Sequence, residues 1–171
     1  MKIFLIFYII LSLYSKLSAS ELARVIFVNG GAYLKHKSSK KSILLAEGDI
    51  ISKNHTIITS GDGLVVIKSA DNSKIKIGPE SEIDVLKLAS QSNEDESSTS
   101  IILKVGGVFL SILKSAIESN GKVKATVKTK NGVALAVRGT KLFVSTIEGD
   151  DRVWASVRNG IVALYVNDSL I

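Results

Sequence analysis

Short runs of apolar and β-branched residues, each ended by a turn signal, recur along most of the chain. In Lys74–Ile77 lysines alternate with isoleucines. Successive side chains of a strand point to opposite faces of a sheet, so this alternation predicts a strand with one buried and one solvent-facing side. Val133–Val137 is apolar on both faces, which predicts an inner strand. Because such runs recur with one proline and few helix caps, the pattern predicts an all-β domain.

Turn signals indicate how these strands connect. Asn-Gly is the strongest short hairpin signal, since a type I′ turn needs positive φ at both central residues. It occurs four times, at Asn29-Gly30, Asn120-Gly121, Asn131-Gly132 and Asn159-Gly160. We therefore predict a rolled antiparallel sandwich or a solenoid-like β domain built from short hairpins.

Two of these turns lie in similar segments near the two ends of the predicted domain. Arg24–Leu34 and Arg152–Leu164 each read as a strand, an Asn-Gly turn and a strand. A chance match is the favoured interpretation, because hairpins look alike. The alternative is that the first and last hairpins occupy equivalent places in a rolled sheet.

Two segments differ from the rest of the chain. Ser90–Ser100 is polar, serine-rich and locally acidic, which predicts a mobile loop. Residues 1–20 combine a positive start, an apolar run and the small residues of Ser18–Ser20, as is typical of a cleavable secretory signal. An uncleaved anchor is the alternative, although the run is shorter than the roughly 20 residues of a membrane-spanning helix. The β domain is expected over 21–171, with its core at about 25–166.

Net charge and cysteine content limit the classes of function that the chain could have. The net charge of the whole chain is +6, and removal of Lys2 and Lys16 with the signal leaves +4, which is too little by itself to indicate nucleic-acid binding. The chain has no cysteine, so hydrophobic burial must hold the fold, and thiolate chemistry is excluded. We expect a periplasmic or secreted protein with no transmembrane span in the mature chain.

Enzyme motifs are missing from the sequence. His36 and His55 lie on separate turn or loop segments without acidic residues at ligand spacing, so no metal site is expected. Neither a phosphate-binding glycine loop nor a nucleophile elbow occurs. We expect no catalysis, no metal and no cofactor. An envelope hydrolase with an unrecognised site is the alternative.

Basic residues recur at alternate positions between 122 and 130. Ala125 and Val127 take the opposite face of the same predicted strand. Such a row could attract an anionic envelope polymer, although a solvated face that discourages edge pairing is the commoner reason. The candidate ligand-binding residues are Lys122, Lys124, Lys128 and Lys130.

Arg138, Gly139 and Thr140 form a second candidate group, in the middle of an apolar strand pattern. A guanidinium could bind a carboxylate or phosphate in two places at once. The favoured interpretation is structural: Gly139 permits a bend, and Arg138 satisfies carbonyl groups where the ladder breaks. Trp154, beside small residues, is expected to pack in the core rather than to stack on a sugar ring.

The order of these features resembles the FecR domain family, extracytoplasmic modules of iron-transport regulators and other exported bacterial proteins. The similar segments are Ala46–Ile51, Ile57–Gly61, Leu64–Ile67, Val105–Val108 and Val127–Thr129, and Ala136–Thr140 matches the family's VRGT signature. The resemblance runs from about Val25 to Val166. It implies a β-rich module in receptor-linked signalling, while the family's cytoplasmic sigma-factor-binding segment has no counterpart here, so the anti-sigma role is not expected.

These observations together predict an exported, non-catalytic binding module. Its expected ligand is a cell-envelope polymer or an envelope protein, and not nucleic acid. The alternative function is a periplasmic sensor component of a receptor-linked transcriptional signalling pathway, without an anti-sigma segment of its own.

Overall fold

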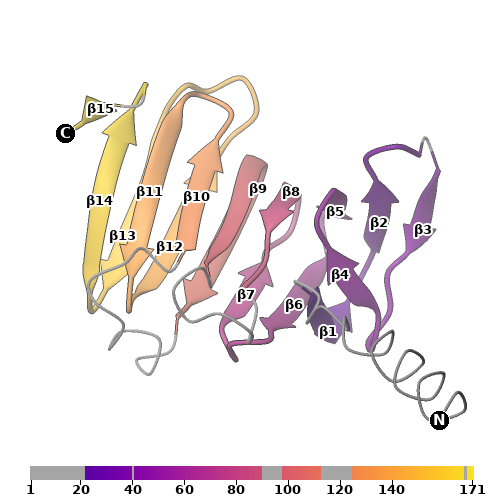
Figure 1. Ribbon diagram of the computed structural model, residues 1–171. Coiled ribbons are helices and arrows are strands. Elements are labelled where there is room, and N and C mark those ends of the chain that lie inside the picture. The colour runs from indigo at the N-terminus through magenta and orange to yellow at the C-terminus, as the bar shows by residue number, and fades with distance from the viewer. Residues whose placement is uncertain (1–21, 40, 90–97, 113–124, 168) are drawn as a thin grey trace, which may run out of the picture.

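The computed structural model describes residues 22–39, 41–89, 98–112, 125–167 and 169–171. These residues form 15 strands and no helix, joined into one continuous sheet that stacks on itself as two layers (Figure 1). The all-β prediction is confirmed. Within the described ranges there is no helix with the length and apolarity that a membrane span requires.

Layer A is antiparallel throughout and runs in the order β4-β1-β6-β7-β9-β12-β13. Its strands are β1 (Leu22–Asn29), β4 (Ile50–Ser52), β6 (Leu64–Ser69), β7 (Lys74–Ile77), the second half of β9 (Thr99–Ser111), β12 (Lys141–Thr146) and β13 (Val153–Arg158).

Layer B runs in the order β3-β2-β5-β8-β9-β10-β11-β14-β15. Its further strands are β2 (Ala32–His36), β3 (Ser42–Leu44), β5 (His55–Thr59), β8 (Glu82–Lys87), β10 (Ala125–Thr129), β11 (Val133–Arg138), β14 (Ile161–Val166) and β15 (Ser169–Leu170). The β9–β10 pair is parallel, so the sheet is mixed where an antiparallel arrangement was predicted.

Strand β9 belongs to both layers. Its first half pairs with β8 and β10 in layer B, and its second half pairs with β7 and β12 in layer A. The bend lies at Gly106, whose φ is +89°. A Cβ atom there would lie 2.2 Å from Ser81 Oγ, so glycine is required by both backbone angle and space. Leu103 and Val108, on the two sides of the bend, are both fully buried.

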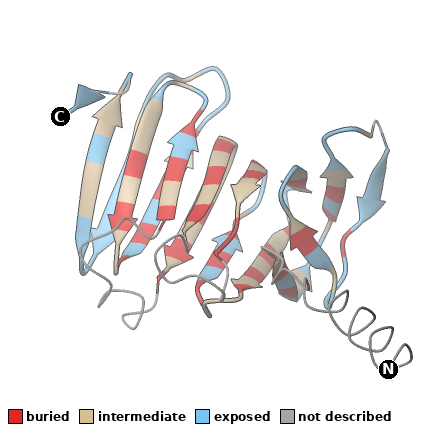
Figure 2. Cartoon of the chain, viewed as in Figure 1, coloured by how far each residue is buried: buried red, intermediate tan, exposed pale blue. Residues whose placement is uncertain are grey.

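The inner faces of the two layers form one hydrophobic core. Ile67 and Ile75 from layer A and Ile57 and Leu103 from layer B are all fully buried. Buried and partly exposed residues alternate along the central strands, whereas β14 and β15 carry no buried residue (Figure 2). In β7 the isoleucines are buried and the lysines exposed, as the alternation predicted.

Several turns carry the chain from one layer to the other instead of reversing it within a layer. Asn29-Gly30 joins β1 of layer A to β2 of layer B, and Asn159-Gly160 joins β13 of layer A to β14 of layer B. The joined strands are not paired, so the hairpin prediction is wrong at both places. The two similar segments share this crossing. Asn131-Gly132 does join a paired hairpin, β10–β11, and Asn120-Gly121 lies outside the described residues.

Hydroxyl groups hold neighbouring crossings together. Thr59 Oγ1 donates a hydrogen bond to the Gly78 carbonyl oxygen at 2.7 Å and accepts one from the Ser81 N–H at 2.9 Å. Ser81 Oγ in turn accepts a hydrogen bond from the Gly107 N–H at 2.9 Å. These side chains satisfy backbone groups that no strand ladder reaches.

Two predicted segments lie wholly or partly outside the residues that the structure describes. The expected signal at residues 1–20 lies outside them, as do residues 90–97 of the predicted loop. Thr99 and Ser100 belong to β9, so the loop ends at least two residues earlier than predicted.

Candidate binding surfaces

The predicted lysine row can be followed only in part, because Lys122 and Lys124 lie outside the described residues. Lys128 is exposed on the outer face of layer B. Its register neighbours are Ile102 of β9 and Ala134 of β11, neither of which carries charge. Lys128 therefore has no charged residue directly beside it on the neighbouring described strands, and its role in binding stays a prediction.

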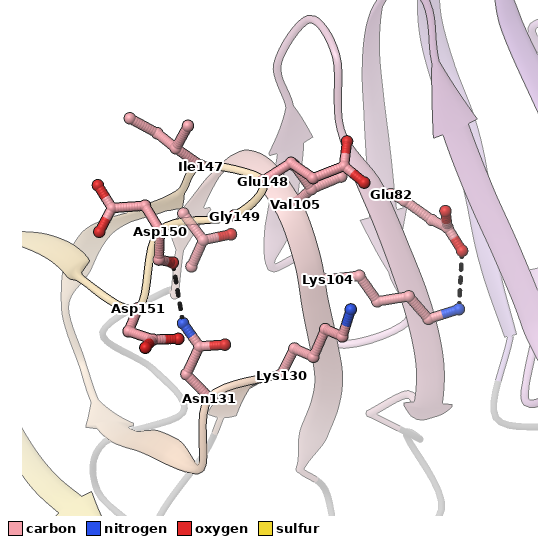
Figure 3. Close-up of a pocket in the computed structure, with 11 residues that line it drawn as sticks. Glu82, Lys104, Val105, Lys130, Asn131, Ile147, Glu148, Gly149, Asp150 and Asp151 are labelled. Carbon is pink, nitrogen blue, oxygen red and sulfur yellow. Dashed lines mark hydrogen bonds and ion pairs between the residues drawn. The ribbon is translucent and has the colours of Figure 1, made fainter.

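Lys130 lies at the rim of a pocket of about 350 Å³ between the ends of the two layers. Its side chain extends toward Lys104, while the 147–151 loop closes the other side (Figure 3). Glu148, Asp150 and Asp151 line the same pocket. Because these carboxyl groups line the same pocket, Lys130 is poorly placed to attract a polyanion.

The charges of this pocket are largely satisfied within the protein. Lys104 Nζ lies 2.7 Å from Glu82 Oε1 and 2.9 Å from Asp84 Oδ1. Burial lowers the pKa of Lys104, but the hydrogen bonds and charges of these two carboxylates outweigh burial and raise it overall. No group of three or more histidine, aspartate or glutamate side chains in the described ranges could hold a metal ion.

The loop beside the pocket is fixed by an exposed ion pair. Arg152 Nη2 lies 2.7 Å from Asp150 Oδ2, and Arg152 Nε donates to the same carboxylate at 3.0 Å. Hydrogen bonds from the Arg152 side chain and then from its backbone N–H lower the pKa of Asp150 to about 2. Asp150 is thus a carboxylate at any physiological pH and is unsuited to proton transfer.

Arg138, Gly139 and Thr140 form the crossing from β11 in layer B to β12 in layer A. Thr140 is 1% exposed, and its hydroxyl donates to the Arg138 carbonyl oxygen at 2.8 Å. Gly139 has a φ of +59°, as expected of a glycine at a sharp bend.

Arg138 was expected to bind the free carbonyl group at this crossing, but Thr140 does so instead. The threonine hydroxyl satisfies the carbonyl group at the break, and the Arg138 guanidinium makes no hydrogen bond or ion pair within the described chain. Arg138 is half-buried on the outer face of layer B. The fold role of Gly139 and Thr140 is supported, and ligand binding by Arg138 stays a prediction.

A surface that the sequence did not reveal lies at the C-terminal end of the two layers. β13 is the last strand of layer A and pairs only with β12 among the described strands. Val157 lies opposite the buried Leu142 and therefore faces inward, yet it is 46% exposed. Leu164 of β14 lies opposite the buried Leu135 and is also exposed. The core is open at this end.

Trp154 was expected in the core, and that prediction is wrong. It is 42% exposed and lies opposite Ser145 on the outer face of layer A. The Arg152 guanidinium carbon is 5.0 Å from the centre of its ring. Core packing was expected because a large aromatic side chain in a strand is usually buried. The sequence of β13 does not show which of its two faces meets the other layer, and the pairing with Ser145 turns Trp154 outward.

Comparison with protein families gives a match. The model of the FecR protein family matches residues 55–163, which is more than half of the chain. This match begins at β5, so β1 to β4 precede it. Neither the curated proteins nor the solved structures contain a match.

Proposed function

Because the chain belongs to the FecR protein family, we propose that it is a non-catalytic sensing component of a receptor-linked signalling pathway. It works outside the cytoplasm, where the export signal expected from residues 1–20 would send it. Its task is to dock a partner protein, and the docking site is the open C-terminal end of layer A.

The free edge of β13 is the observation that carries this proposal. β13 is six residues long, whereas natural proteins usually keep exposed edge strands short or place lysines along them. Its outer edge has no strand partner within the described chain. An edge strand of this length offers a row of backbone donors and acceptors to a strand of another protein.

The side chains at this end require the same kind of partner. Ala155 and Val157 face inward from β13, and Leu164 faces inward from β14, but all three are exposed. A strand added beside β13 would cover the inward side chains of layer A while it satisfies the backbone edge. Strand addition thus supplies hydrogen bonds and apolar cover in one step.

The charged groups of the structure favour a binding role over catalysis. Lys104 is paired with Glu82, as Figure 3 shows, and also with Asp84. Asp150 is paired with Arg152. A general acid or base needs a pKa near the working pH, and the pKa of Asp150 lies far below it.

The proposal is tested with two variants of the same strand. Val157→Lys places a charge on the inward side of the open end, whereas Ser156→Lys places the same charge on the outer face one residue away. Both variants are expressed in a strain that lacks the native copy, with a photo-crosslinking residue at position 155. Crosslinked proteins are identified by mass spectrometry, and the transcriptional response is measured by RNA sequencing.

We expect crosslinking to a receptor domain or a membrane signalling protein, loss of crosslink and response in V157K, and retention of both in S156K. Circular dichroism checks that both variants are folded. A deletion strain with an unaltered transcriptome, or a folded V157K that signals like wild type, would overturn the proposal.

A further inference from the structure

A straight row of cationic side chains crosses the outer face of layer A. Register partners on adjacent strands share a face of the sheet, so the row follows from pairing alone. Arg24 of β1 is paired with Lys68 of β6, and Lys68 with Lys74 of β7. Ser111 of β9 stands between Lys74 and Lys141 of β12, and Lys141 is paired with Arg158 of β13. These residues are called the cationic row: Arg24, Lys68, Lys74, Lys141 and Arg158.

No acidic residue balances this row within the strands of layer A. Their cationic residues are those of the cationic row and Lys76, and their sequences contain neither aspartate nor glutamate. No ion pair of a cationic-row residue occurs in the described part of the chain. On layer B, by contrast, Lys104 is paired with Glu82 and Asp84.

Such an arrangement is unfavourable for the isolated protein. Like charges directly opposite each other on paired strands destabilise a sheet. Lys68 faces Lys74, and Lys141 faces Arg158, in this way. An anionic ligand lying along the row would offset the repulsion between these cations, because each cation would attract an anionic group of the ligand. Binding would also release the counterions held by a polyanionic ligand.

The same face carries hollows beside the row. One, of about 370 Å³, is lined by Lys68, Asn72, Lys74 and Ser111, so the middle of the cationic row forms its walls. The next, of about 450 Å³, is lined by Lys76, Gly78, Pro79, Gly107, Phe109 and Phe143.

The second hollow is a shallow aromatic groove. Phe109 and Phe143 are direct register partners, and Phe143 is 41% exposed. Both lie two residues along their strands from the cationic row, because Ser111 and Lys141 are the next outward positions. A ligand that fills both hollows must carry anionic groups on one side and flat, partly apolar surfaces on the other.

We propose that the outer face of layer A binds a linear anionic polysaccharide. Its carboxylate, phosphate or sulfate groups lie on the cationic row, and its sugar rings lie against Phe109 and Phe143. Six strands at a spacing of about 4.8 Å give the row a length of about 24 Å, which suits an extended chain better than a single head group. This surface goes beyond the proposed function, since Lys68 and Lys74 lie on strands remote from the β13 edge.

Single-stranded nucleic acids and anionic membranes could also bind a row of cations, but the structure favours neither as the ligand. A single-stranded nucleic acid stacks successive bases on aromatic residues interleaved with the basic ones, whereas Phe109 and Phe143 lie together in one groove beside the row. An anionic membrane would require apolar side chains that project beyond the cations, but these two rings line a hollow. Export, expected from residues 1–20, also brings the chain to glycans rather than to nucleic acids.

The test compares two double variants of full-length mature protein with equal charge changes on opposite layers. Lys68→Glu with Lys74→Glu reverses the middle of the cationic row, and Lys128→Glu with Lys130→Glu is the control on layer B. Binding to polygalacturonate is measured by isothermal titration calorimetry from 25 to 200 mM salt, with neutral dextran as the uncharged polymer. Single-stranded DNA and phosphatidylglycerol vesicles are the competing polyanions. The variant F143S tests the groove.

We expect K68E/K74E to weaken polygalacturonate binding at least about tenfold and to lower the salt slope by about two, one for each lost anion contact. K128E/K130E should change affinity less than about threefold. F143S should weaken binding without a change in salt slope, and dextran should not bind. Equal losses in both double variants, tighter binding to DNA or vesicles than to polygalacturonate, or no binding at 25 mM salt would each overturn the proposal.

Discussion

His36 and His55 are register partners on β2 and β5, and their rings meet edge to face with centroids 5.4 Å apart. Each ring nitrogen Nδ1 accepts a backbone hydrogen bond, His36 from the Ser38 N–H and His55 from the Ser52 N–H, both at 3.2 Å. These bonds need an unprotonated Nδ1. Burial, and then the charge that a protonated His36 would carry, lower the pKa of His55 below its usual 6.5.

This pair predicts a loss of stability on mild acidification. Because the pKa of His55 is lower in the folded than in the unfolded protein, the unfolded chain binds more protons as the pH falls through 6.5, so stability declines until the folded pKa is passed. We expect Tm to fall more between pH 7.5 and pH 5.5 in wild type than in His55→Asn, whose side-chain oxygen can accept the Ser52 N–H without titrating. A His55 pKa at or above 6.5 by NMR would contradict this expectation.

The hydroxyl of Thr59 should contribute measurably to stability. Thr59→Val keeps the shape but leaves the Gly78 carbonyl and the Ser81 N–H without their partner, which should lower the free energy of unfolding by about 1–3 kcal/mol. Thr146→Val is the matched control. Thr59 is 4% and Thr146 5% exposed, but Thr146 Oγ1 has no hydrogen-bond partner among the residues that the structure describes, so its replacement should be neutral or stabilising. Urea unfolding measures both, and equal losses would refute the assignment.

Glycine is required at the last crossing between layers. A Cβ atom on Gly160, whose φ is +110°, would lie 2.1 Å from Thr140 Oγ1. Gly149 also has positive φ, +75°, but a Cβ atom on it would have no neighbouring atom within 4 Å. We expect Gly149→Ala to cost about 1 kcal/mol from backbone strain alone, and Gly160→Ala at least about twice as much. Thermal unfolding of the two proteins tests this order.

Asp62 should make the protein sensitive to strong acid. Hydrogen bonds from the Ser60 hydroxyl and then from the Gly31 N–H lower the pKa of its exposed carboxyl group. A pKa lowered by folding gives stability that is present above the unfolded value of 3.8 and is lost as the pH falls through the folded value. Between pH 5 and pH 2.5 Tm should decline more steeply in wild type than in Asp62→Asn. Parallel declines would show that Asp62 does not contribute.

Strands and the faces of their side chains were predicted well from the sequence, because both depend on residues that are adjacent in the chain. The alternation of Lys74–Ile77 and of Ala125–Lys128 appears in the structure as predicted. Turn signals were less decisive. An Asn-Gly step permits positive φ in a hairpin and in a layer crossing alike, so Asn159-Gly160 could not be assigned without knowing which strand pairs with β14.

The binding surfaces depend on strands that are distant in the chain. Lys68 and Lys141 lie far apart in sequence, and only the pairing of β7 and β12 with β9 places them in one row. The predicted row at 122–130 followed a single strand, which is the only kind of row that a sequence displays. The exposure of Trp154 also depends on the fold, since its pairing with Ser145 places it on the outer face of layer A.

Strand β9 has a consequence for how the molecule comes apart. Strand β9 is an interior member of both layers, so neither layer can unfold while the other stays intact. Unfolding of either layer would release β9, and the other layer would then lose the strand that joins its two halves. The two-layered body should therefore melt as a single cooperative unit, and the amide protons of Ile101, Leu103, Val108 and Leu110 should be among the last to exchange with solvent.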